Sequence, residues 1–361
     1  MYKQPNRQNS FLGSMIYDRI IPKTHFLKQV SEVVDFSFVN DLCRDCYCAE
    51  FYIFKRSASR PCRDEDNGRA GYEPAMMFKI VFLQFLYDIS DRRVEEELTF
   101  NLALKWFIGI EADELPPDYS TLSRFRDRLG AERFKDIFNR IVEVARDKGY
   151  ISDRLTIIDS THIEAKVDLF RLKKGHKGDK GDKDYIDKGS PDMDASFGHK
   201  TKKKVFYGYK QHNAMDADSE MITTCEVTTG REPDGAQLPC LIRGQPAGAT
   251  ADKAYDSDQN HFYLKREGIQ SGIILKKNRV NEEIIKGVDV SLKLERPKIE
   301  HKFGELKKWH GLRIARYWGL GKIAIQCLIS CIVVNCKRMV RIAFSPMKVL
   351  RPLEPAPLKV A

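Results

Sequence analysis

The stretch that decides the fold is Leu155-Thr156-Ile157-Ile158-Asp159, a short apolar run that ends in an acid. Apolar and β-branched residues in such a run are typical of a buried strand. A carboxylate beside buried apolar residues is costly unless it is paired or bound to a cation. We therefore predict that a strand lies here and that Asp159 either binds a metal ion or caps the turn that follows.

A second informative stretch surrounds Glu300 near the C-terminal end of the chain. At about 100° per residue, Arg296, Glu300 and Lys307 fall within roughly 40° of each other on a helix. An apolar stripe adjoins them on the same helix, formed by Ile299, Phe303 and Leu306. This pattern presents a carboxylate between two cations, which suits a metal ion beside a phosphate, although surface ion pairs would use the same spacing.

A third acid, Asp252, lies in an expected strand over residues 249–254, with Asp256 as a nearby rival. Hydrolysis or transfer of a phosphodiester is served by two divalent cations about 3.5–4 Å apart, which neutralise the attacking and leaving oxygens. Mg²⁺ prefers oxygen ligands, so a few carboxylates suffice. We predict that Asp159, Asp252 and Glu300 converge at one edge of a sheet.

The N-terminal half has a helical pattern. Residues 1–20 are polar and are expected to be flexible, and residues 21–149 are expected to form an all-α region. Pro74 is placed to open a buried helix, and Ser90 to cap a helix whose apolar positions continue to Trp106.

The second half contains a basic, low-complexity stretch that we expect to be a mobile loop, residues 168–204. Within it, residues 171–204 hold eleven Lys or Arg against six Asp. A stretch with so few apolar residues cannot bury much surface. It is either a solvated loop or a DNA contact. Strands are expected around 205–214, where Lys210 could reach a phosphate, and around 221–228.

Composition narrows the partners and the compartment. The net charge of +10 and the pI near 9.0 favour a polyanionic partner such as nucleic acid. The longest apolar run, residues 324–334, is short of the ~20 residues of a membrane span. Nothing at the N-terminus resembles a signal peptide, so we expect a reduced, cytoplasmic protein. Four cysteines are expected to be free thiols, with a zinc site as the alternative: Cys43, Cys46, Cys48 and Cys62.

The chain resembles the DDE transposases of bacterial insertion sequences in the order of its three acids, Asp159, Asp252 and Glu300. It also has the pattern Arg-x-x-x-Glu-x-x-x-x-x-x-Lys around the last acid, formed with Arg296 and Lys307. It is similar to the group with a Tyr-Arg-Glu-Lys signature. Motifs that resemble the 1182-type elements extend over about residues 20–340, and include Ile21-Pro22-Lys23-Thr24-His25-Phe26-Leu27, Asp118-Tyr119-Ser120-Thr121-Leu122-Ser123-Arg124-Phe125-Arg126 and Ala251-Asp252-Lys253-Ala254-Tyr255. One position departs from the signature, because Lys293 stands where the Tyr is expected.

The resemblance implies an α/β protein with an RNase H-like catalytic domain over residues 150–342, in which a mixed sheet is flanked by helices. An all-α domain over residues 21–149 would precede it and bind the ends of the element, and residues 343–361 would be a disordered tail. By the resemblance, Asp159, Asp252 and Glu300 bind two Mg²⁺ ions, with Mn²⁺ as a substitute. The expected DNA contacts are Arg296, Lys307, Lys210, Arg124 and Lys253.

The activity implied is cleavage of double-stranded DNA at the terminal inverted repeats of the element, followed by joining to target DNA. The resemblance also implies a homodimer on DNA, associated with the nucleoid in the cytoplasm. Two alternatives remain open at this point. One is a DNA-binding protein derived from a transposase that no longer cleaves DNA, and the other is an RNase H-like host nuclease.

Overall fold

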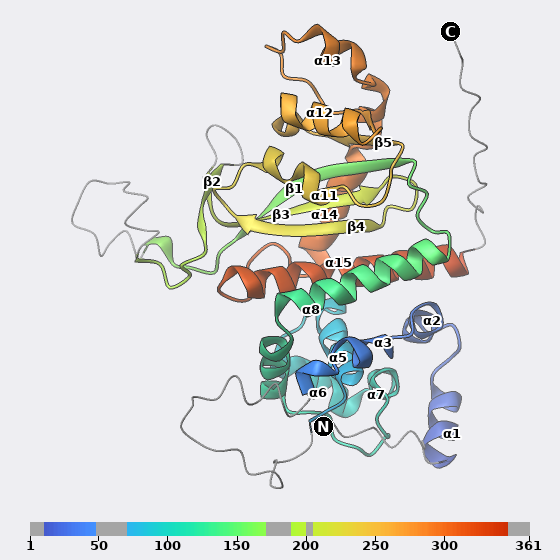
Figure 1. Ribbon diagram of the computed structural model, residues 1–361. Helices are drawn as coiled ribbons and strands as arrows, with labels where there is room; N and C mark the ends of the chain where they lie inside the picture. The colour runs from blue at the N-terminus through green and yellow to red at the C-terminus, as the bar shows by residue number, and fades with distance from the viewer. Residues whose placement is uncertain (1–10, 48–70, 171–188, 200–204, 346–361) are drawn as a thin grey trace.

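The computed structural model describes residues 11–47, 71–170, 189–199 and 205–345, which form a helical part followed by a part built on a sheet (Figure 1). The elements of the helical part are α1 (Phe11–Ile20), α2 (Phe26–Val33), α3 (Phe38–Leu42), η1 (Asp45–Tyr47), α5 (Pro74–Leu86), α6 (Asp91–Phe100), α7 (Leu102–Ile108) and α8 (Tyr119–Asp147). In Figure 1 these helices lie below the sheet, and α8 runs along the boundary between the two parts.

Within the described residues, the second part holds a mixed sheet of six strands. They are β1 (Leu155–Glu164), β2 (Ser196–His199), β3 (Val205–Asp216), β4 (Ile222–Thr229), β5 (Gly248–Ala251) and β6 (Gln270–Ser271). The order is β2-β3-β1-β5-β6, and β4 also pairs with β3. β3 is antiparallel to β1, β2 and β4, whereas β1, β5 and β6 are parallel. This sheet with flanking helices, after a helical N-terminal region, confirms the predicted fold class.

The second part also contains helices, which lie between its strands or after the last strand in the chain. They are η2 (Asp234–Gln237), α11 (Leu238–Leu241), η3 (Lys253–Tyr255), α12 (Asp258–Arg266), α13 (Glu282–Gly287), η4 (Val290–Glu295), α14 (Pro297–Trp309) and α15 (Leu320–Phe344). α14 packs against β1, and α12 packs beside β6. In Figure 1, α12 and α13 lie at the top of the molecule, beyond β5.

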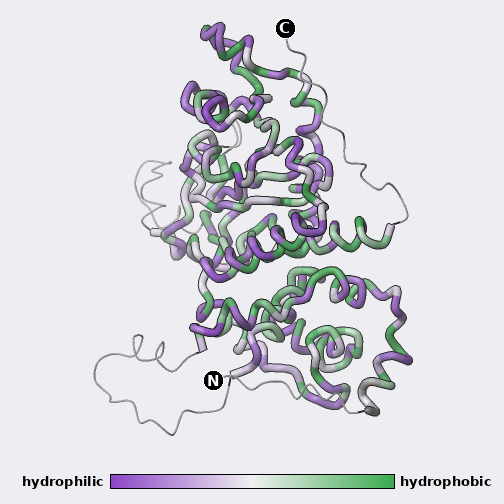
Figure 2. Tube along the Cα trace, turned by 45° about the vertical axis from the view of Figure 1, so that its right-hand side comes forward, coloured by the Kyte–Doolittle hydropathy of each residue, from purple (hydrophilic) through white to green (hydrophobic). Residues whose placement is uncertain are grey.

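The C-terminal helix α15 joins the two parts. It packs against β4 of the sheet and against α2, α5 and α8 of the helical part. Asn335 fixes the contact with the sheet, because its Oδ1 accepts from Ile222 N and its Nδ2 donates to Ile222 O, both at 2.8 Å. Figure 2 shows hydrophobic stretches where the helical part below meets the sheet part above. One continuous core therefore runs through both parts.

By length and composition alone, α15 could cross a membrane, and among the described residues it is the one helix that could. However, 83% of its most apolar window is buried inside the protein. Burial in a core accounts for a helix of this composition, because a helix that is apolar on most sides needs partners on most sides.

The ends of the chain differ from their predictions. The flexible segment predicted over residues 1–20 is wrong for its second half, which forms α1. Tyr17 of that helix is buried, and its hydroxyl donates to Ile110 O at 2.7 Å. The tail predicted over residues 343–361 is wrong for residues 343–344, which belong to α15. The rest of that segment lies outside the described residues.

The helix predicted from Ser90 to Trp106 is two helices. The cap at Ser90 is confirmed, since its Oγ accepts from Arg93 N at 3.2 Å. Asn101 ends α6 with an extended backbone and caps α7, where its Oδ1 accepts from Ala103 N at 3.0 Å. A residue that caps one helix and begins the next is not visible in apolar spacing alone.

Two strand boundaries also differ. The strand predicted to end at Asp159 continues to Glu164, because β3 pairs with β1 along this whole length. The strand predicted to carry Asp252 ends one residue before it. Both acids nevertheless lie where the pairing of β1 with β5 stops, so they are neighbours in the folded sheet.

The loop predicted over residues 168–204 is wrong for residues 189–199, which are packed. β2 pairs with the start of β3 and extends the sheet. Just before it, Asp192 is buried, and its Oδ1 accepts from the Tyr209 hydroxyl at 2.5 Å and from Gly319 N at 3.1 Å. A buried carboxylate with two donors anchors this segment, a role that the polar composition does not indicate. Most of the rest of the predicted loop lies outside the described residues.

Candidate active site

Asp159 and Asp252 lie next to each other where the pairing of β1 with β5 stops. β1 and β5 are parallel, and Ile158 lies opposite Ala251 in the last paired position. The next residue on each strand is an acid, so both acids leave the pairing at the same edge of the sheet. Asp252 also caps η3, where its Oδ1 accepts from Lys253 N at 2.6 Å. The structure thus brings two of the three predicted acids together.

The third acid is connected to this pair through Arg296. Its guanidinium lies 3.1 Å from Asp159 Oδ2 and 3.0 Å from Glu300 Oε1, so it bridges the two carboxylates. Arg296 stands at the N-terminal end of α14, and Glu300 lies in the first turn of that helix. The predicted apolar stripe of α14 is buried against the sheet, which fixes the helix in this position: Ile299, Phe303 and Leu306.

The electrostatics of Asp159 differ from those of an ordinary surface acid. Its side chain is 13% exposed, whereas that of Glu300 is 53% exposed. The pKa of Asp159 is raised to about 6, chiefly by burial; Arg296 and the hydrogen bond from Ser160 N oppose this shift, and the nearby charge of Asp252 adds to it. A carboxylate in this setting gains from an additional cation close by.

The ionisation of Asp159 gives an expected pH dependence. A carboxylate binds a metal ion only when it is deprotonated. With the pKa of Asp159 raised to about 6, metal affinity should fall as the pH decreases through that value and should level off above it. Calorimetric titration with Mn²⁺ on both sides of this pKa measures the effect. A metal affinity that stays constant through it would contradict the assignment.

The acids suit a hard divalent cation, because all three offer carboxylate oxygens and two of them share one edge of the sheet. Among the described residues, however, no three acidic, His or Cys side chains lie close enough together to hold a metal ion as they stand. Arg296 lies between Asp159 and Glu300 instead. Convergence of all three acids on one ion therefore requires Arg296 to turn away from this bridge.

Three of the side chains predicted to contact DNA are exposed or half-buried: Lys253, Arg124 and Lys307. Lys253 is exposed and directly follows Asp252. Lys307 is half-buried on α14, about two turns after Glu300. Arg124 is exposed on α8 in the helical part, where it lines a cavity of about 330 Å³. Lys253 thus directly follows Asp252 and Lys307 lies on the helix that carries Glu300, whereas Arg124 belongs to the helical part.

The prediction that Lys210 reaches DNA does not fit its contacts. Its ammonium donates to Asp234 Oδ1 and to Glu232 O, each at 2.8 Å, and its side chain is 13% exposed. Asp234 also accepts from Ser160 Oγ at 2.9 Å. A chain of polar groups therefore connects β3 to the residue after Asp159. Sequence reasoning did not find it, because the partners are far apart along the chain and meet only in the folded sheet.

The predicted rival acid, Asp256, is not part of this edge. Its carboxylate is buried and accepts from His261 Nε2 at 2.9 Å and from Arg279 Nη2 at 2.6 Å. Burial acts to raise its pKa, but hydrogen bonds from Lys276 N, Arg279 and His261 bring the pKa below its ordinary value. It is a structural acid, and Asp252 is the acid that adjoins Asp159.

The cysteines that raise the question of zinc are only partly described. Cys43 and Cys46 are buried free thiols, and burial raises the pKa of Cys43 to about 12. Cys48 and Cys62 lie outside the described residues.

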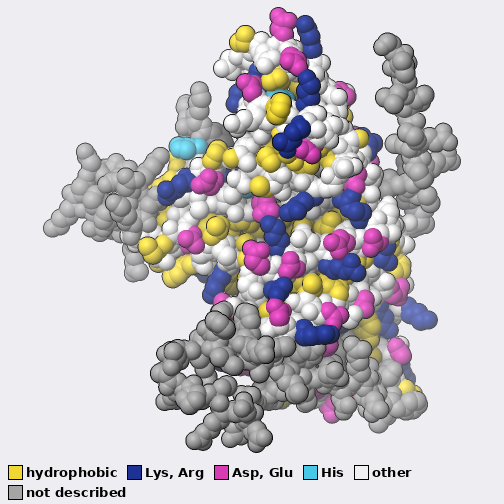
Figure 3. Space-filling view, viewed as in Figure 1, with side chains coloured by type: hydrophobic (Ala, Val, Ile, Leu, Met, Phe, Trp, Pro, Cys, Tyr) yellow, Lys and Arg dark blue, Asp and Glu magenta, His cyan; other side chains and the backbone are white. Residues whose placement is uncertain are grey.

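The excess positive charge does not form one patch on the side of the molecule that Figure 3 shows. Lys and Arg side chains are mixed with Asp and Glu over the described part of that face. Ion pairs within the described residues, such as Lys135 with Glu226 and Arg154 with Asp218, also neutralise some of the cations. Any DNA contact on this face therefore depends on particular cations rather than on a continuous basic surface.

The class to which this chain belongs is the DDE transposases, which are metal-dependent enzymes that cut and join DNA. The chain matches the family model described as "Transposase DDE domain" over residues 150–336 and belongs to that family. Residues 15–128 match the model described as "Transposase domain (DUF772)". This pair of domains is the signature of the 1182-type insertion-sequence transposases, and it confirms the resemblance seen in the sequence.

Solved structures with some similarity are also transposases. A piggyBac transposase synaptic complex with hairpin DNA is 12% identical, with 87% of this chain and 75% of that chain covered and a TM-score of 0.37. A pre-cleavage Mos1 transpososome is 10% identical, with 90% and 99% covered and a TM-score of 0.19. These scores describe only a partial likeness in shape.

Proposed function

We propose that this transposase binds the terminal inverted repeats of its own element and cleaves there with Asp159, Asp252 and Glu300 as the metal-binding triad. The observation that carries this proposal is the parallel register of β1 and β5, which places Asp159 beside Asp252. The bridge through Arg296 supports the addition of Glu300. The proposed ions are two Mg²⁺, with Mn²⁺ as a substitute.

The reaction consists of two phosphoryl transfers. Water attacks a phosphodiester at the end of the element, and the 3′-oxygen leaves with a proton. The resulting 3′-hydroxyl then attacks a phosphodiester of the target, and the target's own 3′-oxygen leaves with the proton. Asp159, Asp252 and Glu300 would hold the two ions, which when bound would supply activation of the attacking oxygen and neutralisation of charge on the leaving oxygen. Asp159 and Asp252 hold the negative charge that attracts the ions, and Arg296 turns from the carboxylates toward a DNA phosphate. Lys253 and Lys307 contact phosphates on either side.

The helical region, residues 21–149, is proposed to bind the ends of the element. Arg124 supports this because it is exposed on α8 beside Arg128 and Tyr47, in a cavity that combines cations with aromatic rings. Because two ends must be processed together, we propose a homodimer on DNA. The compartment proposed is the cytoplasm, in association with the nucleoid.

The test uses the full chain and a duplex that carries the inverted repeats flanking its own reading frame. In the presence of Mg²⁺, we expect cleavage at the repeat and joining of the freed 3′-end to a second duplex. Binding with no cleavage under any divalent ion would instead identify a DNA-binding protein without activity. Cleavage with no joined product would identify a nuclease.

A further inference from the structure

A second feature of the sheet edge is the turn Lys276–Arg279, which follows β6. The chain continues past β6 in register with β5, because Gly272 N donates to Ala249 O at 2.7 Å and Ile274 N donates to Ala251 O at 3.0 Å. The turn closes with a hydrogen bond from Arg279 N to Lys276 O at 3.1 Å. It therefore leaves the sheet at the same edge as Asp252, which directly follows Ala251.

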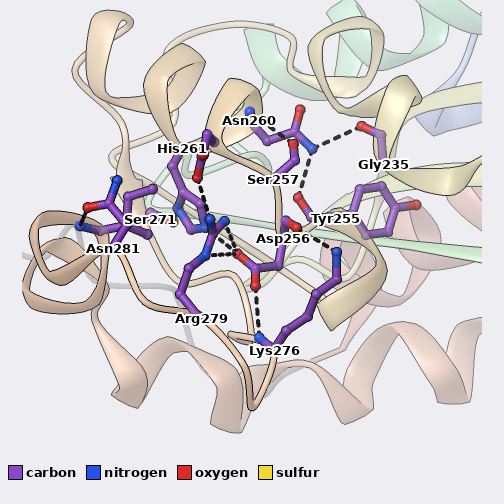
Figure 4. A network of polar contacts seen from close by, with 12 residues as sticks. Gly235, Tyr255, Asp256, Ser257, Asn260, His261, Ser271, Lys276, Arg279 and Asn281 are labelled. Atoms are coloured by element: carbon purple, nitrogen blue, oxygen red, sulfur yellow. Dashed lines mark hydrogen bonds and ion pairs between the residues drawn. The ribbon is translucent and has the colours of Figure 1, made fainter.

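Asp256 holds the turn in place through hydrogen bonds and an ion pair (Figure 4). The Asp256 side chain is 1% exposed, and its Oδ2 accepts from Lys276 N at 2.8 Å. Its Oδ1 accepts from Arg279 Nε at 3.1 Å and Nη2 at 2.6 Å, and from His261 Nε2 at 2.9 Å. Lys276 Nζ in turn donates to Asp256 O at 2.8 Å. Asp256 follows Asp252 by only four residues, so the same short segment holds the acid and the turn.

These contacts engage two of the three cations of the turn. Arg279 is ion-paired with Asp256 and Asp258, and Lys276 bonds to a backbone carbonyl. Lys277 lies at the corner of the turn and is exposed. Within the parts of the chain that the structure describes, neither a hydrogen bond nor an ion pair engages its ammonium. A rigid turn that presents an uncompensated cation beside a carboxylate edge suits a polyanion bound across that edge.

We propose that the turn Lys276–Arg279 is a DNA-binding element of the catalytic part, in which Lys277 contacts a backbone phosphate next to the cleavage site and Asp256 is the positioning residue that holds the turn. The proposal rests on the proposed function, because it takes DNA at this edge as the substrate. A phosphate contact adds affinity without reading the base sequence.

The first test compares Lys277→Ala with Lys286→Ala in the full-length protein. Lys286 is a matched control on α13, because it is exposed but ion-paired with Glu282. We measure affinity for duplex DNA carrying the repeat over a range of salt concentrations. Loss of one phosphate contact should weaken binding and reduce the slope of log K against log salt by about 0.9, whereas the control should leave the slope unchanged. An unchanged slope for Lys277→Ala overturns the proposal while leaving the proposed function intact.

The second test introduces Asp256→Asn into the wild type and into Lys277→Ala. If Asp256 acts by holding Lys277 in place, its substitution weakens DNA binding in the first background and has little further effect in the second. Equal losses in both backgrounds overturn the positioning role. Should Asp256→Asn melt below the assay temperature, Arg279→Gln replaces it, since it removes the longest side chain bound to Asp256. Failure of the wild type to bind or cleave DNA refutes the proposed function itself, and this inference with it.

Discussion

Asp159→Asn is expected to reduce Mg²⁺-dependent cleavage by about 10³-fold or more while leaving DNA binding nearly unchanged. A metal ion at a phosphoryl-transfer site supplies several kcal/mol of charge stabilisation, and about 4 kcal/mol corresponds to about 10³-fold in rate. The Asp159 side chain is 13% exposed and adjoins Asp252, so an amide at this position removes one of the proposed metal ligands. Single-turnover cleavage of a labelled repeat measures the loss.

The stability of the same variant shows whether a loss of cleavage comes from the missing metal ligand or from a destabilised fold. Burial raises the pKa of Asp159, so the folded protein is penalised for carrying this charge above about pH 6. The metal-free Asn variant should therefore melt no lower than the wild type at neutral pH, although Arg296 loses a charged partner. Added Mn²⁺ should raise the melting temperature of the wild type only. Full cleavage activity in the variant would refute the assignment of the triad.

The second large effect is expected in the helical part. Arg126 is 6% exposed at its side chain, is ion-paired with Asp91, donates to Gln84 Oε1 at 3.3 Å and lies over the ring of Tyr317 at 5.0 Å. Removing one partner of a buried pair leaves the other charge uncompensated, which costs about 3–5 kcal/mol. Because Asp91 is 26% exposed and partly hydrated, we expect Arg126→Ala to lower the free energy of unfolding by about 3 kcal/mol.

Arg124→Ala is the matched control for this prediction. It lies two residues away on the same helix and is exposed, so its removal should change stability by less than about 0.5 kcal/mol. Urea unfolding of both variants distinguishes the two positions. Similar midpoints for the two would show that the pair with Asp91 adds no stability.

Local signals made parts of the fold predictable. Pro74 opens α5 and Ser90 caps α6 as expected, because these residues act on their own helix. The apolar stripe on α14 likewise predicted which side of the helix is buried. The identity of the three acids came from a family resemblance together with their strand and helix contexts.

The remaining features depend on partners that are distant along the chain. Lys210 was predicted on a strand, but whether its charge is available depends on Asp234, which only the folded sheet brings near. The packing of residues 189–199 depends on Tyr209 and on the segment before α15, and the polar composition gives no sign of it. The register between strands and the ion pairs between residues distant along the chain therefore could not be predicted from this sequence.

The position of α15 has a consequence for how the protein is made. Helices α2, α5 and α8 of the helical part and strand β4 of the sheet all pack on α15, which follows every one of them in the chain. Neither part can complete its packing before α15 has been synthesised, so folding of both parts is expected to wait for this helix. A copy of the gene interrupted upstream of this segment should thus yield no folded fragment able to occupy the ends of the element and block an intact enzyme.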